Sequence, residues 1–408
     1  MSTPTTSRIP AGFVLLLGAL VAIGPLTIDL YLAAFPRITT DLATTPAAVQ
    51  FTITATLAGL ALGQLLIGSL SDAMGRRRPL IAGLVLYVVA SLVIVIVPNV
   101  GLLATARFAQ GLGASAGMVL SMAIVRDRFE GVQVGKVLAR LMLVVGVAPA
   151  LAPLIGAQFL LLGTWRWMFV ALAGFGVLLL VLAVFVVPES LPADRRRAGG
   201  VGPAVKSYLG LLGDRTFMAL ALLSGFSMAG IFTYVSTATF VYQGEFGLST
   251  QQFALLFASG AVAITAGTQL NGLLVGRVAP TRILTVAVCV SLVVAVALVV
   301  FALTGAGLVP LVIALLGTLL CAGILLPAVP VIALEANAHR AGSAAALLGA
   351  VQFGVGAAAA PLTGLFGGGS ESMAIVMSSA AAVTGLLVLV ARRGFPATPR
   401  AEKVLATG

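Results

Sequence analysis

Apolar runs long enough to cross a bilayer alternate with short polar segments along almost the whole chain of 408 residues. A membrane-spanning helix needs roughly 20 predominantly apolar residues. By this measure the sequence predicts an all-α membrane protein. Its twelve transmembrane helices are expected at about 11–36, 48–70, 79–97, 101–125, 137–162, 166–188, 216–241, 249–274, 282–303, 308–333, 342–366 and 372–391.

Positively charged residues fall almost entirely in alternate loops between these runs. With the N-terminus placed in the cytoplasm, 20 of the 23 lysine and arginine residues lie on the cytoplasmic side. Arg37 and Arg166 lie outside, and Arg107 lies within a span. This asymmetry follows the positive-inside rule. We therefore expect both termini in the cytoplasm and a location in the bacterial inner (cytoplasmic) membrane.

The composition agrees with this pattern and excludes several classes of function. Hydrophobic residues make up 60% of the chain and charged residues only 9%, against about 25% charged residues in soluble domains. The net charge of +11 is explained by the loops, so we expect no nucleic-acid partner. Cys289, Cys321 and His339 show no metal-ligand spacing. We expect no metal site and no enzyme activity, because no catalytic constellation lies within the spans.

The two halves of the chain also resemble each other in sequence. A long hydrophilic stretch at 189–215 divides it into two halves, and the string at 152–156 is echoed 208 residues later at 360–364. We predict an N-terminal six-helix bundle at 1–190, a cytoplasmic linker at 191–214 and a pseudo-symmetric C-terminal six-helix bundle at 215–408. Two six-span repeats are typical of alternating-access transporters, whose substrate site lies between the halves.

Two charges of opposite sign lie inside the predicted membrane region. Asp29, in the first span, would cost at least ~2.5–3.5 kcal/mol to insert as an unpaired ion. Helical rise places it roughly 10 Å below the outer boundary, and Arg107 of the fourth span roughly 9 Å below it. We expect the two charges to compensate each other, with Gln110 completing the hydrogen bonds. Such a pair is either a structural link or a titrating site for proton coupling.

Four stretches carry a resemblance to a known family. The turn at 68–78 resembles the G-x-L-x-D-x-x-G-R-R/K-x loop of the major facilitator superfamily, and 107–113 resembles its R-x-x-Q-G-x-G segment. The stretch at 146–156 resembles a variant of the Gly/Pro-rich antiporter signature. The stretch at 29–36 resembles the D-x-Y-L-P-A-x-P of the Bcr/CflA-type drug-resistance branch, with Ala33 in place of a proline.

This resemblance implies the major facilitator fold and proton-coupled antiport that exports small drug-like molecules of the chloramphenicol, bicyclomycin or sulfonamide class. Arg126 and Asp127 belong either to a cytoplasmic gate or to an anchor at the membrane surface. The implied roles are proton coupling for Asp29, Arg107 and Gln110, the cytoplasmic gate for Gly68, Asp72, Gly75 and Arg76, and the antiporter helix signature for Gly146, Pro149, Pro153 and Gly156.

The remaining expectations concern the substrate and the energy source. Asp29, Tyr31, Tyr234 and Gln352 are predicted to line the substrate cavity, with ordinary packing as the alternative for the last three. The sequence has no nucleotide-binding G-x-x-x-x-G-K-[ST] loop, so we expect a proton gradient as the driver and no cofactor. The expected partners are a small molecule, protons and the lipid bilayer, and we expect a monomer. A proton-linked importer of a small metabolite on the same fold is the alternative.

Overall fold

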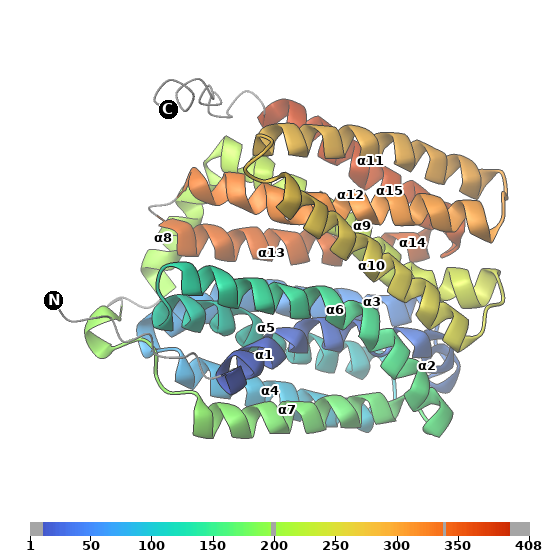
Figure 1. The fold of residues 1–408 in the computed structure, drawn as a ribbon. Helices are drawn as coiled ribbons and strands as arrows, with labels where there is room; N and C mark the ends of the chain where they lie inside the picture. The colour runs from blue at the N-terminus through green and yellow to red at the C-terminus, as the bar shows by residue number, and fades with distance from the viewer. Residues whose placement is uncertain (1–10, 197–200, 338–339, 392–408) are drawn as a thin grey trace, which may run out of the picture.

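The computed structural model describes residues 11–196, 201–337 and 340–391, and these residues are almost entirely helical (Figure 1). The helices of the N-terminal half lie below those of the C-terminal half in this view. The elements are α1 (Ala11–Asp29), η1 (Leu32–Ala34), α2 (Phe35–Asp41), α3 (Pro46–Met74), α4 (Arg77–Val95), α5 (Val100–Arg128), α6 (Val132–Leu162), α7 (Arg166–Val186), η2 (Ala193–Arg195), α8 (Val201–Leu212), α9 (Arg215–Thr239), η3 (Phe240–Glu245), α10 (Thr250–Leu274), α11 (Pro280–Leu303), α12 (Leu308–Glu335), α13 (Ala341–Ala359), α14 (Leu362–Leu365) and α15 (Ser370–Ala391).

Within the described residues, twelve helical segments are long and apolar enough to cross a membrane. They coincide with the twelve predicted spans, which confirms the all-α prediction. Three of them are interrupted: Ala11–Asp41 contains α1, η1 and α2, Arg215–Glu245 contains α9 and η3, and Ala341–Gly364 contains α13 and α14. Figure 1 places α2 and α14 at one end of the molecule, here called the far end, and α8 at the other, here called the linker end.

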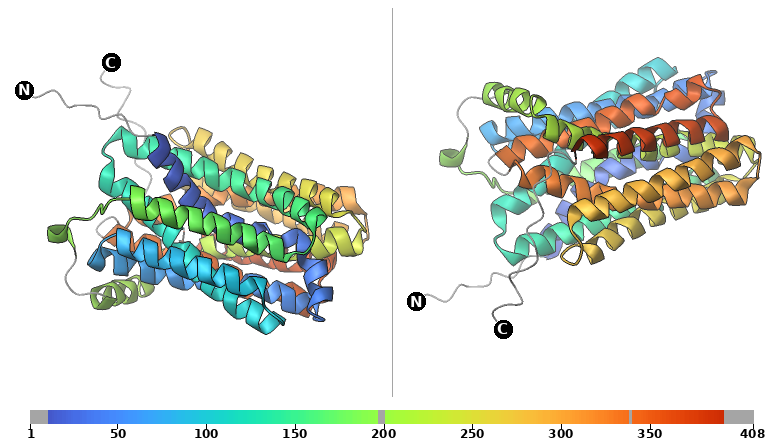
Figure 2. Two further views of the ribbon diagram at one scale, coloured as in Figure 1. Left: turned by 90° about the horizontal axis from the view of Figure 1, so that it is seen from below. Right: turned by 90° about the horizontal axis from the view of Figure 1, so that it is seen from above.

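Each half is built around a ring of four helices. In the N-terminal half α1, α5, α4 and α7 contact one another in that order, and α9, α12, α11 and α15 do the same in the C-terminal half. The two remaining spans of each half join the halves, because α3 packs on α13 and α6 packs on α10. Figure 2 shows the same arrangement from two further directions. The internal repeat of the sequence is therefore a repeat of packing.

Local contacts at the far end repeat in the same register. Thr45 caps α3 through its side chain, and Ser249, 204 positions later, caps α10 with a full capping box. Asp41 forms a salt bridge with Arg166 at the start of α7. Glu245, which lies 204 positions after Asp41, accepts hydrogen bonds from the backbone N–H and the hydroxyl of Ser370, at the start of α15. In each half, a carboxylate at the end of the first span therefore binds the start of the last span.

Candidate functional site

Asp29 is the last residue of α1, at the point where the first span is interrupted. Its side chain is only 4% exposed, and it forms no hydrogen bond or salt bridge with any residue that the structure describes. Leu30, the next residue, packs against Gly156 of α6. A Cβ added at Gly156 would overlap with the Leu30 carbonyl oxygen. Only glycine leaves room for this approach. The Gly/Pro-rich signature of α6 therefore holds the segment that carries Asp29.

Arg107 lies in α5 and is completely buried. Its Nη2 donates to the carbonyl oxygen of Thr27 at 2.8 Å, and its guanidinium carbon lies 4.2 Å from the centre of the Tyr31 ring. Because α1 ends at Asp29, the Thr27 carbonyl has no partner in a following helical turn. The guanidinium supplies that partner and also gains a cation–π contact.

The expected direct pairing of Asp29 with Arg107 is not formed in this conformation. Among the described residues, neither side chain takes part in a salt bridge. Arg107 nevertheless bonds to a carbonyl only two residues before Asp29, so the two groups lie at similar depth. The carbonyl dipole at the end of α1, not the carboxylate, compensates the guanidinium.

A buried polar network extends from Arg107 through α1, α4 and α5, three of the four helices of the ring. As expected, Gln110 takes part: its Oε1 accepts from Arg107, and its Nε2 donates to the Ser91 hydroxyl at 2.8 Å. Thr27 donates to the Tyr87 hydroxyl at 3.0 Å. The sequence analysis missed Thr27, Tyr87 and Ser91, because single neutral polar residues in separate spans carry no spacing signal. The network holds the positively charged guanidinium of Arg107 in place inside the N-terminal half.

The four residues predicted to line a cavity do not all lie together. Tyr234 lies in α9 of the C-terminal half and is buried. Tyr234 also stacks on Phe257, with ring centres 5.1 Å apart. In contrast, Tyr31 is buried inside the N-terminal half beside Arg107, and Gln352 donates to Ser224 at 2.6 Å within the C-terminal half. Tyr31 therefore lies in the N-terminal half, whereas Tyr234 and Gln352 lie in the C-terminal half.

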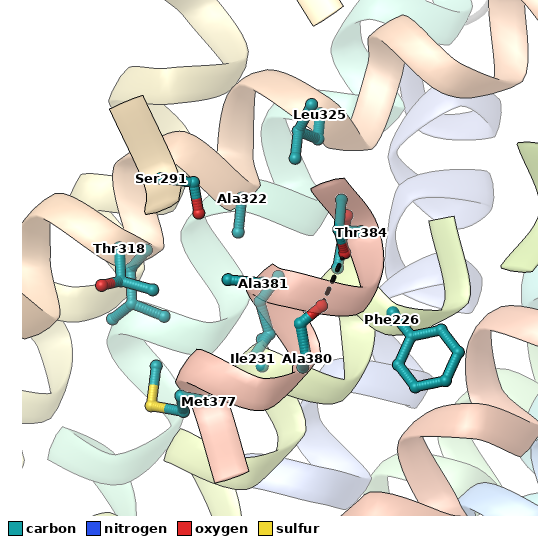
Figure 3. A pocket seen from close by; sticks show the side chains of 13 residues that line it. Phe226, Ile231, Ser291, Thr318, Ala322, Leu325, Met377, Ala380, Ala381 and Thr384 are labelled. Atoms are coloured by element: carbon teal, nitrogen blue, oxygen red, sulfur yellow. Dashed lines mark hydrogen bonds between the residues drawn. The ribbon is translucent and has the colours of Figure 1, made fainter. Parts of the chain in front are cut away.

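The C-terminal ring contains a small cavity of about 20 Å³ (Figure 3). The side chains that line it include Ser291, Thr318 and Ala322, which are small and neutral. A second cavity, of about 230 Å³, lies at the far end of the same half. Neither is lined by Asp29 or Tyr234, and both are smaller than the roughly 300–1,000 Å³ of pockets for drug-sized ligands.

The described residues contain no cluster of three or more histidine, cysteine, aspartate or glutamate side chains that could hold a metal ion. His339 and several of the loop arginines, Arg8 and Arg392 among them, lie outside the described residues.

At the linker end, the turn between α3 and α4 carries a cluster of charged groups. Gly75 has a φ of +90°, which favours glycine, whereas Gly68 lies inside α3 with no positive φ. The turn predicted at 68–78 therefore begins only at Gly75, and Gly68 belongs to the helix before it. Arg76 bonds to Asp72 at 2.6 Å and to Asp127 of α5 at 3.0 Å. These contacts join α3, α4 and α5.

The remaining predicted gate residue, Arg126, is exposed and makes no salt bridge within the described part of the chain. A residue that the sequence analysis missed, Glu189, accepts hydrogen bonds from the backbone N–H groups of Arg76 and Arg77, at 2.7 and 3.4 Å. Its only signal in the sequence is its position, where the chain leaves the sixth span. The Arg76 salt bridges lie within the N-terminal half, and the Glu189 hydrogen bonds tie that half to the segment that follows α7.

The linker-end cluster is expected to depend on pH through Glu189. Burial raises the pKa of Glu189, but the backbone N–H groups of Leu191, Arg76 and Arg77 and the Arg196 guanidinium outweigh burial, so its pKa is lowered. A lowered carboxyl pKa stabilises the folded turn above the ordinary glutamate pKa, and the effect is lost as the pH falls through the lowered value. We predict that hydrogen exchange at the Arg76 and Arg77 amides accelerates over that acidic range.

In Glu189→Gln the same amides should exchange faster than in the wild type at neutral pH, with a much weaker pH dependence beyond the intrinsic chemistry. Asp194→Asn, in the exposed linker, is the matched control and should exchange like the wild type. Equal protection of these two amides in Glu189→Gln and the wild type at neutral pH would contradict this assignment.

Comparison with known proteins agrees with the fold. The family model described as Major Facilitator Superfamily matches residues 15–361. The D-xylose–proton symporter in a crystal structure aligns with a TM-score of 0.72 and 18% identity, covering 95% of this chain and 97% of that one. A partially occluded inward-open structure of the xylose transporter XylE from Escherichia coli aligns with a TM-score of 0.71 and 15% identity, covering 95% of this chain and 99% of that one.

Sequence relatives point to one branch of that family. An uncharacterized MFS-type transporter, YdgK, from Bacillus subtilis is 40% identical over 91% of this chain and 92% of its own length. A bicyclomycin resistance protein homolog from Haemophilus influenzae is 30% identical over 85% and 87%, respectively. The multidrug resistance protein MdtL of Vibrio parahaemolyticus is 31% identical over 66% and 65%.

This chain belongs to the major facilitator superfamily, and its relatives agree with the Bcr/CflA-type drug-resistance branch. It is therefore a multi-pass membrane transporter and not an enzyme.

Proposed function

We propose that this transporter exports small drug-like molecules in exchange for protons, by opening its two ends alternately. The observation that carries the proposal is Asp29: a buried carboxyl at the interruption of the first span, without a hydrogen-bond or salt-bridge partner in the described residues. An intramembrane acid is a functional site by default, because its ionised form is costly in that environment. The names of the drug-resistance relatives support the substrate class.

The arrangement around Arg107 supports a proton-binding role for Asp29. Because the guanidinium is already bonded to Thr27 and Gln110, Asp29 is not committed to a fixed ion pair. Protonation would remove the cost of a buried charge, and opening of the boundary between the halves would return that carboxyl to water. The protonation state of one side chain can therefore bias which conformation is favoured.

The proposed cycle follows from this coupling. Asp29 takes a proton from outside the cell, and its neutral form favours the inward-facing state. Substrate entering from the cytoplasm promotes release of the proton inward, and the loaded protein returns to the outward-facing state. We place the termini in the cytoplasm of a bacterial inner membrane on the basis of the positive loops. Neither of the two cavities described above is lined by Asp29, and in this cycle the substrate enters when the boundary between the halves opens.

The test uses inverted membrane vesicles that contain the full-length protein and hold a proton gradient. Addition of chloramphenicol, bicyclomycin or a sulfonamide should dissipate the gradient and produce uphill accumulation of the drug inside the vesicles. Accumulation in right-side-out vesicles that depends on the gradient would instead indicate the proton-linked importer. The absence of any proton movement with every compound, together with unchanged drug susceptibility of an efflux-deficient bacterium, would reject the proposal.

A further inference from the structure

Where α3 meets the C-terminal half at the far end, two polar groups are buried without partners. The Gln50 side chain is 0% exposed, and neither its amide nitrogen nor its amide oxygen forms a hydrogen bond with any described residue. One helical turn further along α3, the Thr54 hydroxyl oxygen is also buried and unpaired. Residues four apart share a helix face, so the two groups form one polar strip.

This strip faces the interrupted eleventh span. A Cβ added at Gly364 would lie 2.8 Å from the Gln50 amide oxygen and 2.9 Å from the Ala47 side chain. Further along the same interface, Gln64 contacts Gly349 of α13 in the same way. The residue numbers rise along α3 from Gln50 to Gln64 while those of the partners fall from Gly364 to Gly349. The helix α3 and the α13–α14 segment therefore pack antiparallel from the far end toward the linker end. Gln50 and Thr54 lie at the far end of this contact.

The hydroxyl groups of α9 and of the segment before Gly364 bond to one another or to a backbone carbonyl, and not to Gln50. The Thr237 and Thr363 hydroxyls lie 2.8 Å apart, and the Ser236 hydroxyl donates to the Ala360 carbonyl at 3.3 Å. A buried amide without a partner loses the hydrogen bonds that it would make with water. Separation of α3 from α13 and α14 would expose the Gln50 amide to water, so that it could form those hydrogen bonds again.

We infer that Gln50 and Thr54 form a release element at the far end: closure of this end leaves them unsatisfied, so they favour its opening. The inference rests on the alternating opening of the two ends that the proposed function requires. It assigns to these residues a positioning role in the conformational equilibrium, not contact with substrate or proton.

The pseudo-symmetric interface lacks this element. The positions 204 residues after Gln50 and Thr54 are Ala254 and Ala258 of α10, the helix that packs on α6. At that interface the hydroxyl of Thr265 is satisfied, because it donates to the Gly146 carbonyl at 3.1 Å. The two equivalent positions of α10 therefore carry no polar side chain that closure could leave unpaired.

The experiment measures the distance between spin labels at the exposed positions Thr40 and Thr304, one in each half at the far end. The full-length protein carries Cys289→Ser and Cys321→Ser, so that only the introduced cysteines are labelled. The test variants are Gln50→Leu and Thr54→Val, which keep nearly the same volume without the unpaired groups. The matched control is Gln64→Leu, the same change on the same face of α3, where no amide atom is both buried and unpaired.

Under conditions in which the wild type populates both a short and a long distance, Gln50→Leu should lower the long-to-short ratio about tenfold, in line with the cost of an unsatisfied buried amide. Thr54→Val should lower it less, and Gln64→Leu should leave it near the wild-type value. The thermal stability of Gln50→Leu in detergent should also rise.

An unchanged ratio in Gln50→Leu, or an equal change in Gln64→Leu, would overturn the inference. An unchanged ratio would also mean that a buried water or another group satisfies the amide. This outcome is distinct from failure of the proposed function, in which the labels report opening that Gln50 controls but no drug is exported.

Discussion

Asp29→Asn is expected to abolish uphill drug export and drug-induced proton movement, with losses of about 10²–10⁴-fold, as for other side chains that transfer protons. The carboxamide has nearly the shape of the carboxyl but cannot release a proton in the accessible pH range. Because Asp29 is buried and unpaired within the described residues, the substitution should not break a structural contact. Downhill exchange of drug and the amount of folded protein should therefore be retained.

The measurement compares proton movement and drug accumulation in inverted vesicles with those of Asp194→Asn, which changes a carboxylate in the exposed linker. The control should behave like the wild type. Proton-coupled uphill export by Asp29→Asn would show that another group carries the proton, and the proposed cycle would be wrong.

Arg107→Lys is expected to destabilise the N-terminal half and to reduce transport at least about tenfold, although it retains the positive charge. Hydrogen bonds that involve a charged group contribute about 1.5–3 kcal/mol each. A lysine ammonium cannot bond to Thr27 and Gln110 while also stacking flat on Tyr31, as the planar guanidinium does. The unpaired Thr27 carbonyl would then loosen the end of α1 that carries Asp29.

Thermal unfolding in detergent and transport in vesicles measure this effect. Arg140→Lys, a substitution of the same type at the linker-end part of α6, is the control and should change neither. If Arg107→Lys matches the wild type in both assays, the charge alone is sufficient, and the geometry of the guanidinium plays no part in transport.

The two halves differ more in their interiors than in their packing. The N-terminal ring is filled by a charged and hydrogen-bonded network, whereas the corresponding C-terminal ring leaves a small cavity lined by Ser291, Thr318 and Ala322. The Nη1 and Nη2 atoms of Arg107 donate to Gln110 and Thr27, whereas its Nε is buried without a partner among the described residues.

The sequence by itself determined the number, order and approximate limits of the spans. This follows because the bilayer sets the length of every crossing helix and excludes charge from its interior. The same restriction made Asp29 and Arg107 recognisable, since an intramembrane charge has few neutral explanations. The capping signal at Ser249 likewise depends only on the local backbone.

Only the tertiary structure decided how those charged residues are satisfied. The end of α1 at Asp29 exposes the Thr27 carbonyl, which offers Arg107 a partner that no motif records. Glu189 and Gln50 were not predicted, because their significance depends on contacts with segments more than 100 positions away. Hydrophobic patterning fixes which residues leave water, but contacts between distant helices decide which buried polar groups find partners.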